Sequence, residues 1–131
     1  MADCEGTLHP RAREGIILFN EGKYFEAHEE LEAAWKDEKG KIRELYQGIL
    51  QAGVTYLHIT RGNYAGAIKV YARSMKWLKG WPETCRGVGI GQLRNDLDVA
   101  IEEVKRLGER RITEFDRSLL KPVVWKEVED G

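Results

Sequence analysis

A single histidine in an acidic segment is the first feature whose residue types suit chemistry. The segment 26–32 reads EAHEELE, and in a helix His28 and Glu32 share one side because they are four residues apart. An imidazole and a carboxylate so placed can hold one metal ion or one hydrogen-bonded ligand, and they can equally satisfy each other. Glu32 stands where the zinc-protease motif has its second histidine. We therefore treat His28 and Glu32 as weak metal candidates and expect no cofactor.

A stripe of polar side chains follows one face of the otherwise apolar segment 41–61. If this segment folds back on segment 24–35 as a hairpin, the stripe crosses the His28 region, with Arg43 beside Trp35 and within reach of Glu32. The candidate ligand-binding residues are His28, Glu29, Glu32, Arg43, Gln47 and Gln51. The alternative is a structural network that holds the bundle in register, or simply the wet face of the helix.

The stripe ends in Thr55 and His58, and the hairpin register sets His58 apart. At 1.5 Å per residue, His58 lies roughly a dozen ångströms beyond the point opposite His28. We expect it near the first helix or the turn at 61–63, in a different neighbourhood from His28.

A weak basic face occurs on the segment 64–78. Lys69, Arg73 and Lys76 share one side of the expected helix, and Trp77 and Trp81 are close by. Basic residues with aromatic residues can bind nucleic acid. However, the acidic remainder of the chain cancels this charge, so we favour a solvated helix face and regard nucleic acid as an unlikely partner.

These candidate residues must be positioned by helices. Hydrophobic spacing predicts five of them, at about residues 10–21, 24–35, 41–61, 64–78 and 90–110. The stretch 80–91 reads as a loop, and no segment shows sustained strand-type alternation. The sequence predicts an all-α, single-domain helical bundle over residues 1–131. We expect residues 1–8 to be flexible and the apolar tail 112–131 to dock on its own bundle or on a neighbouring subunit.

Two of the expected turns repeat a pattern. Gly22 and Gly62 are each followed by a tyrosine two residues on and then by an alanine, Ala27 in one case and Ala67 in the other. Glycine closes one helix, the aromatic ring packs at the start of the next, and alanine lets two helices approach closely. The pattern resembles the helical-hairpin turn of tetratricopeptide repeats. An array needs three or more units with a period of about 34 residues, so we interpret it as two similar hairpins in one bundle.

Several sequence blocks together carry a family resemblance. In order they are FNEGKYFEAHEELE at 19–32 with Trp35, Arg43, LYQG at 45–48, Gln51, His58, RGN at 61–63, and Gly66-Ala67. These blocks, spread over about residues 10–78, resemble the bacterial and archaeal family known as domain of unknown function number 309. The resemblance implies a small helical bundle and no particular activity.

Composition narrows the function classes. The 131 residues are 42% hydrophobic and 33% charged, with a net charge of −1, which is typical of a globular domain without general attraction to nucleic acid or anionic membranes. We expect Cys4 and Cys85 to be free thiols and the protein to be cytoplasmic. The sequence favours a non-enzymatic module that self-associates or holds another protein. The alternative is a metal or small polar ligand, with or without catalysis, in a pocket around His28, Glu32 and Arg43.

Overall fold

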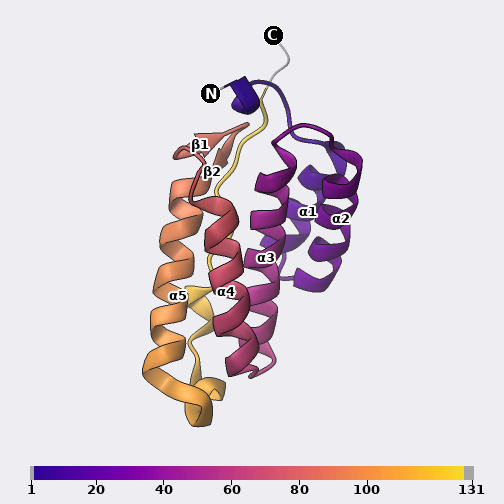
Figure 1. The fold of residues 1–131 in the computed structure, drawn as a ribbon. Helices are drawn as coiled ribbons and strands as arrows, with labels where there is room; N and C mark the ends of the chain where they lie inside the picture. Colours follow the sequence, from indigo (N-terminus) through magenta and orange to yellow (C-terminus); the bar gives the residue numbers. More distant parts are fainter. Residues whose placement is uncertain (1, 129–131) are drawn as a thin grey trace.

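The computed structural model describes residues 2–128, and this part of the chain forms five α-helices (Figure 1). They are α1 (Pro10–Asn20), α2 (Tyr24–Asp37), α3 (Arg43–Thr60), α4 (Tyr64–Leu78) and α5 (Ile90–Arg111). Neighbours in sequence pack side by side, and α3 lies between the α1–α2 hairpin and α4. The predicted all-α bundle is confirmed.

The two glycine turns behave as the repeated pattern indicated. Gly22 (φ 78°) and Gly62 (φ 71°) both adopt the left-handed conformation, which glycine reaches at no steric cost, just after α1 and α3. Asn63 then begins α4, because its side-chain oxygen accepts a hydrogen bond from the Gly66 backbone N–H at 2.9 Å. Both turns reverse the chain, so α2 and α4 run antiparallel to the helices before them.

The core is centred on α3, and α4 approaches it closely. A Cβ atom at Gly48 would lie 2.5 Å from Cδ2 of Leu78, so only glycine leaves room for α4 here. Ser74 of α4 is buried and donates a hydrogen bond to the Gly48 carbonyl at 2.9 Å. This contact fixes the end of α4, with Trp77 and Leu78, against the first half of α3.

A short β-hairpin interrupts the stretch that the sequence presented as a loop. β1 (Thr84–Cys85) pairs antiparallel with β2 (Val88–Gly89), and the turn between them uses positive φ angles at Arg86 and Gly87. Two residues per strand are too few to show alternation, which explains why the pattern was missed. Val88 also forms a bridge with Trp125, and Val123 of the tail is buried. Residues 123–126 therefore lie along the hairpin of their own chain, while residues 129–131 fall outside the described part.

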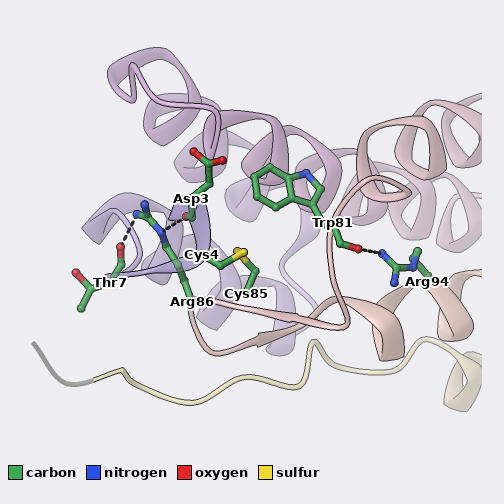
Figure 2. Close-up of a disulfide and its surroundings, with 7 residues drawn as sticks. All are labelled: Asp3, Cys4, Thr7, Trp81, Cys85, Arg86 and Arg94. Atoms are coloured by element: carbon green, nitrogen blue, oxygen red, sulfur yellow. Dashed lines mark hydrogen bonds between the residues drawn. A yellow bond between two sulfur atoms is a disulfide. The ribbon is translucent and has the colours of Figure 1, made fainter. Parts of the chain in front are cut away.

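The expectation of free thiols was wrong. Cys4 and Cys85 form a disulfide that joins the 3-10 turn η1 (Ala2–Cys4) to β1 (Figure 2). Arg86 adds hydrogen bonds from its guanidinium to the carbonyls of Asp3 and Thr7, both at 2.8 Å. The two cysteines are 81 residues apart in sequence, so only the tertiary fold brings their Cα atoms within 4.7 Å. Within the described residues, no helix has the length and apolarity needed to cross a membrane.

Candidate binding groove

A groove of about 520 Å³ opens where α3 begins and α4 ends, at the same end of the molecule as β1 and β2 (Figure 1). It is lined by Lys41, Glu44, Arg73, Lys76, Trp77, Lys79, Gly80 and Trp81. Lys41 and Glu44 come from the start of α3 and the turn before it. The other lining residues come from the last turns of α4 and the loop that follows. A volume of this size is within the range of ligand-binding clefts, which is about 300–1,000 Å³.

Two tryptophans form the apolar wall of the groove. Trp81 is only 5% exposed and belongs to the hydrophobic core, whereas Trp77 is 36% exposed. Arg94 of α5 donates a hydrogen bond to the Leu78 carbonyl at 2.9 Å. It donates a second to the Trp81 carbonyl at 3.0 Å (Figure 2), and the two bonds fix the backbone between these residues. These bonds therefore fix the Trp81 side of the wall in the absence of a ligand.

The charge around the groove is positive and unpaired. Lys41, Arg73, Lys76 and Lys79 face a single lining carboxylate, that of Glu44. Within residues 2–128, none of these four basic side chains forms an ion pair. Several other basic side chains do, such as Arg106 with Glu103 and Arg111 with Glu114. A positive field beside an aromatic wall attracts anionic ligands.

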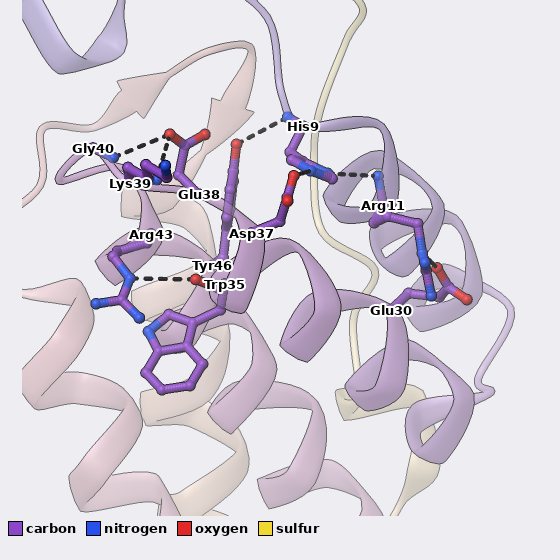
Figure 3. A network of polar contacts seen from close by, with 10 residues as sticks. All are labelled: His9, Arg11, Glu30, Trp35, Asp37, Glu38, Lys39, Gly40, Arg43 and Tyr46. Carbon is purple, nitrogen blue, oxygen red and sulfur yellow. Dashed lines mark hydrogen bonds and ion pairs between the residues drawn. The ribbon is translucent and has the colours of Figure 1, made fainter.

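The hairpin register that the sequence predicted between α2 and α3 is confirmed by Arg43. Its Nε donates a hydrogen bond to the Trp35 carbonyl at 3.2 Å, and its guanidinium carbon lies 4.5 Å from the centre of the Trp35 ring (Figure 3). A cation stacked on an indole in this way is attracted by the π-electrons of the ring. Arg43 is therefore engaged with Trp35.

His28 and Glu32 do come together, but Lys36 shares the contact. His28 Nε2 lies 3.3 Å from Glu32 Oε2, and Lys36 Nζ lies 3.0 Å from Glu32 Oε1. The hydrogen bond from Lys36 lowers the pKa of Glu32, and the charges of Lys36 and His28 act in the same direction. The His28 side chain is 32% exposed, at the edge of the buried face of α2. A metal ion at Glu32 would compete with the ammonium group of Lys36.

Within the described residues, none of the other sequence candidates forms an ion pair with His28. Glu29 is exposed, and Gln47 and Gln51 are half-buried on α3. The backbone carbonyl of Gln51 accepts a hydrogen bond from Thr55 Oγ1 at 2.8 Å. Among residues 2–128, no cluster of three or more His, Cys, Asp or Glu side chains could hold a metal ion.

His58 lies where the register placed it, at the turn after α3. Its Nδ1 is 3.1 Å from Asn63 Nδ2. Burial lowers the pKa of His58, and the nearby charge of Arg61 lowers it further. His58 therefore belongs to the α3–α4 turn.

A third polar cluster, around His9, was not singled out from the sequence (Figure 3). His9 Nδ1 accepts a hydrogen bond from the Arg11 backbone N–H at 3.0 Å, and Nε2 lies 2.7 Å from Asp37 Oδ2. The His9 backbone N–H also donates to the Tyr46 hydroxyl at 2.9 Å. Because both ring nitrogens are occupied, His9 caps α1 and ties it to α2 and α3. The only sequence signal was the start of a helix at His9-Pro10.

The sequence identified part of the groove. Arg73 and Lys76 were assigned to a basic face, and the two tryptophans were noted nearby, while Lys69 of that face does not line the groove. Lys41 and Glu44 were missed because they precede these residues by about 30 positions. A hairpin register about Gly62, of the kind applied to α2 and α3, places position 44 opposite position 80 and could have found them.

Comparison with known proteins bears on the first half of the chain. Residues 12–70 match the family model described as "Domain of unknown function (DUF309)". The family resemblance predicted from the sequence is confirmed. The matched part contains Lys41 and Glu44, whereas the groove residues from Arg73 to Trp81 lie beyond it.

Two relatives extend the similarity. The chain is 28% identical over 111 residues to the uncharacterized protein YpuF of Bacillus subtilis (strain 168), covering 82% of this chain and 60% of YpuF. It is 27% identical over 89 residues to an uncharacterized protein of Aquifex aeolicus (strain VF5), covering 66% of this chain and 26% of that protein. The chain therefore spans less than two thirds of the length of either relative.

Proposed function

We propose that this protein is a non-enzymatic binding module that holds an acidic segment of a protein in the groove between the start of α3 and the end of α4. The observation that carries the proposal is the set of four unpaired basic side chains around two tryptophans, one of them buried. Carboxylates of the bound segment would accept charge-assisted hydrogen bonds from these groups. Trp77 and Trp81 would supply apolar contact for a side chain between the carboxylates.

Glu44 sets the pattern that the segment must have. A carboxylate placed next to Glu44 would be repelled, whereas one placed near Arg73 or Lys76 would be attracted. A segment with an aromatic or aliphatic side chain flanked by acidic residues meets both requirements. Because Lys41, Arg73, Lys76 and Lys79 sit at an exposed site, each contributes little, and we expect modest, salt-sensitive affinity.

An acidic protein segment suits this groove better than a nucleic acid does. Proteins that track a phosphate backbone present a long basic stripe. Here the basic side chains are confined to one groove that also contains Glu44, in a chain with net charge −1. The Cys4–Cys85 disulfide argues against the cytoplasmic location that the sequence predicts, because cytoplasmic thiols are normally kept reduced.

Tryptophan fluorescence provides a direct test. The probe is a short peptide with one central phenylalanine flanked by glutamates, titrated against the whole protein, with a peptide carrying lysines in place of the glutamates as control. We expect saturable binding of the acidic peptide, weakened about tenfold or more by the double change Arg73→Glu and Lys76→Glu. Lys105→Glu, an exposed charge reversal on α5 away from the groove, should leave binding unchanged.

Two outcomes would overturn the proposal. One is equal binding of the acidic peptide by the wild type and by the double variant. The other is no peptide binding together with tight binding of a single-stranded oligonucleotide that the same double variant abolishes, which would make the groove a nucleic-acid site.

A further inference from the structure

Besides Trp77 in the groove, the molecule exposes an aromatic side chain at the start of α2. Among residues 2–128, four large apolar side chains are exposed, and two of them are aromatic: Phe25 (51%) and Trp77 (36%). Phe25 lies in the first turn of α2, next to the α1–α2 turn. The helix then runs about 20 Å toward the end of the molecule that carries the groove (Figure 1). Phe25 therefore cannot reach the groove of its own chain.

The exposed residues that follow Phe25 on α2 are acidic, and the ring of the half-buried His28 lies 6.2 Å from that of Phe25. Glu26 and Glu29 are both exposed, and Glu29 is one helical turn from Phe25 on the same side. Within the described residues, neither carboxylate forms an ion pair. Lys23 is the basic residue nearest to Phe25 in sequence. Its Nζ lies 3.5 Å from Oε1 of Glu21, which neutralises its charge. The Phe25 patch, defined as Phe25, Glu26 and Glu29, is thus an aromatic side chain flanked by unpaired carboxylates.

This patch has the chemistry that the groove is proposed to take, so the inference rests on the proposed function and names its partner. We infer that a second copy of this chain occupies the groove, with the Phe25 patch of one copy seated against Trp77 and the basic side chains of the next. The carboxylates of the patch face the unpaired cations of the groove, and Phe25 covers the exposed ring of Trp77.

Charge also decides how two copies can pair. Patch against patch brings carboxylates together, and groove against groove brings cations together, so both two-fold arrangements are repulsive. Patch against groove is the attractive arrangement. Because the two surfaces are different and lie at opposite ends, this contact leaves a free patch and a free groove in every pair. Such a heterologous contact builds open chains of copies unless the rotation closes a ring.

The association should be weak and sensitive to salt. Each contact involves a few exposed charges and two partly exposed aromatic side chains, which resembles a transient interface. Raising the ionic strength from low to about 1 M shortens the range of the charge attraction to about 3 Å and should dissociate the chains.

Sedimentation velocity over a range of protein concentrations tests the inference. The wild type at low salt should show species beyond the dimer as concentration rises. A patch variant, Phe25→Ala with Glu29→Gln, and a groove variant, Arg73→Glu with Lys76→Glu, should each remain monomeric at concentrations where the wild type associates. Val99→Ala, a truncation of another exposed apolar side chain, on α5, is the matched control and should associate like the wild type. Circular dichroism and melting verify that each variant is folded, which the exposure of these residues favours.

The decisive sample is an equal mixture of the two variants. It contains one intact patch and one intact groove per pair, so we expect dimers that do not grow further. A mixture that stays monomeric while the wild type associates, a wild type that remains monomeric up to about 1 mM, or variants that associate like the wild type would each overturn the inference. The patch variant keeps its groove, so peptide binding to it separates the two proposals. Peptide binding without self-association removes only the second copy as partner, and failure of both removes the groove as well.

Discussion

Breaking the Cys4–Cys85 disulfide should lower the stability of the fold by a predictable amount. The bond closes a loop with a sequence separation of 81 residues. In the chain-entropy account, cross-linking a loop of that length removes unfolded-state entropy worth about 4.5 kcal/mol at 25 °C. Because Arg86 still holds Asp3 and Thr7 by hydrogen bonds, the folded state should keep its shape when the bond is absent. We expect Cys4→Ser to lower the free energy of unfolding by about 3–4 kcal/mol.

Urea unfolding followed by circular dichroism measures this loss. Cys4 is the residue to change, because Cys85 is fully buried and a serine there would place a hydroxyl in the core. The wild type treated with a dithiol reductant should unfold at the same urea concentration as Cys4→Ser, and the variant itself should not respond to the reductant. A loss below about 1 kcal/mol, or a variant that still responds to the reductant, would refute the reasoning that the bond acts through the unfolded chain.

Three further changes test other parts of the structure. Within the described residues, the Tyr56 hydroxyl is buried without a hydrogen-bond partner, and burial raises the pKa of Tyr56. Tyr56→Phe should therefore raise the free energy of unfolding by about 1 kcal/mol in a thermal melt. A decrease would indicate that the hydroxyl has a partner. Gly48→Ala should lower the free energy of unfolding by about 1–3 kcal/mol because the new Cβ would overlap Leu78. In the same urea titration Gly53→Ala should lower it less, because a Cβ there would lie 3.3 Å from Phe19. Folding lowers the pKa of His58 below its ordinary value of 6.5, so between the folded and unfolded pKa values the unfolded chain binds more protons than the folded one. The free energy of unfolding should therefore rise with pH just below 6.5. His58→Gln should remove that rise in melts measured at a series of pH values.

Much of the fold could be predicted because its signals are local. The spacing of apolar residues located each helix, and Gly22 and Gly62 marked two of the reversals, where the structure shows positive φ angles. A simple hairpin register even placed Arg43 beside Trp35 and His58 beside the α3–α4 turn. Helices joined by short turns follow their neighbours, so position along one helix predicts position on the next.

The candidate site was harder to predict because it depends on side-chain partners. His28 and Glu32 had suitable types and spacing, but Lys36 also holds Glu32, and Arg43 is engaged with Trp35. Spacing shows which side chains can share a helix face, and it does not show which contacts they make there. The sequence predicted only part of the groove because the lining residues come from two separate segments. Whether a charged side chain is unpaired also depends on the positions of all its possible partners.

The sequence by itself therefore determined the five helices, their order and the positions of their turns, because these depend on interactions within one or two helical turns. The tertiary structure alone decided that residues 2–8, the β1–β2 hairpin and residues 123–126 meet at one end of the bundle, where Cys4 bonds to Cys85 and Val88 pairs with Trp125. It also decided that four basic side chains and two tryptophans enclose one groove, while Phe25 stands exposed away from it. Contacts between residues so far apart follow from how the helices pack and where the tail returns, and neither is encoded in the local spacing of apolar residues.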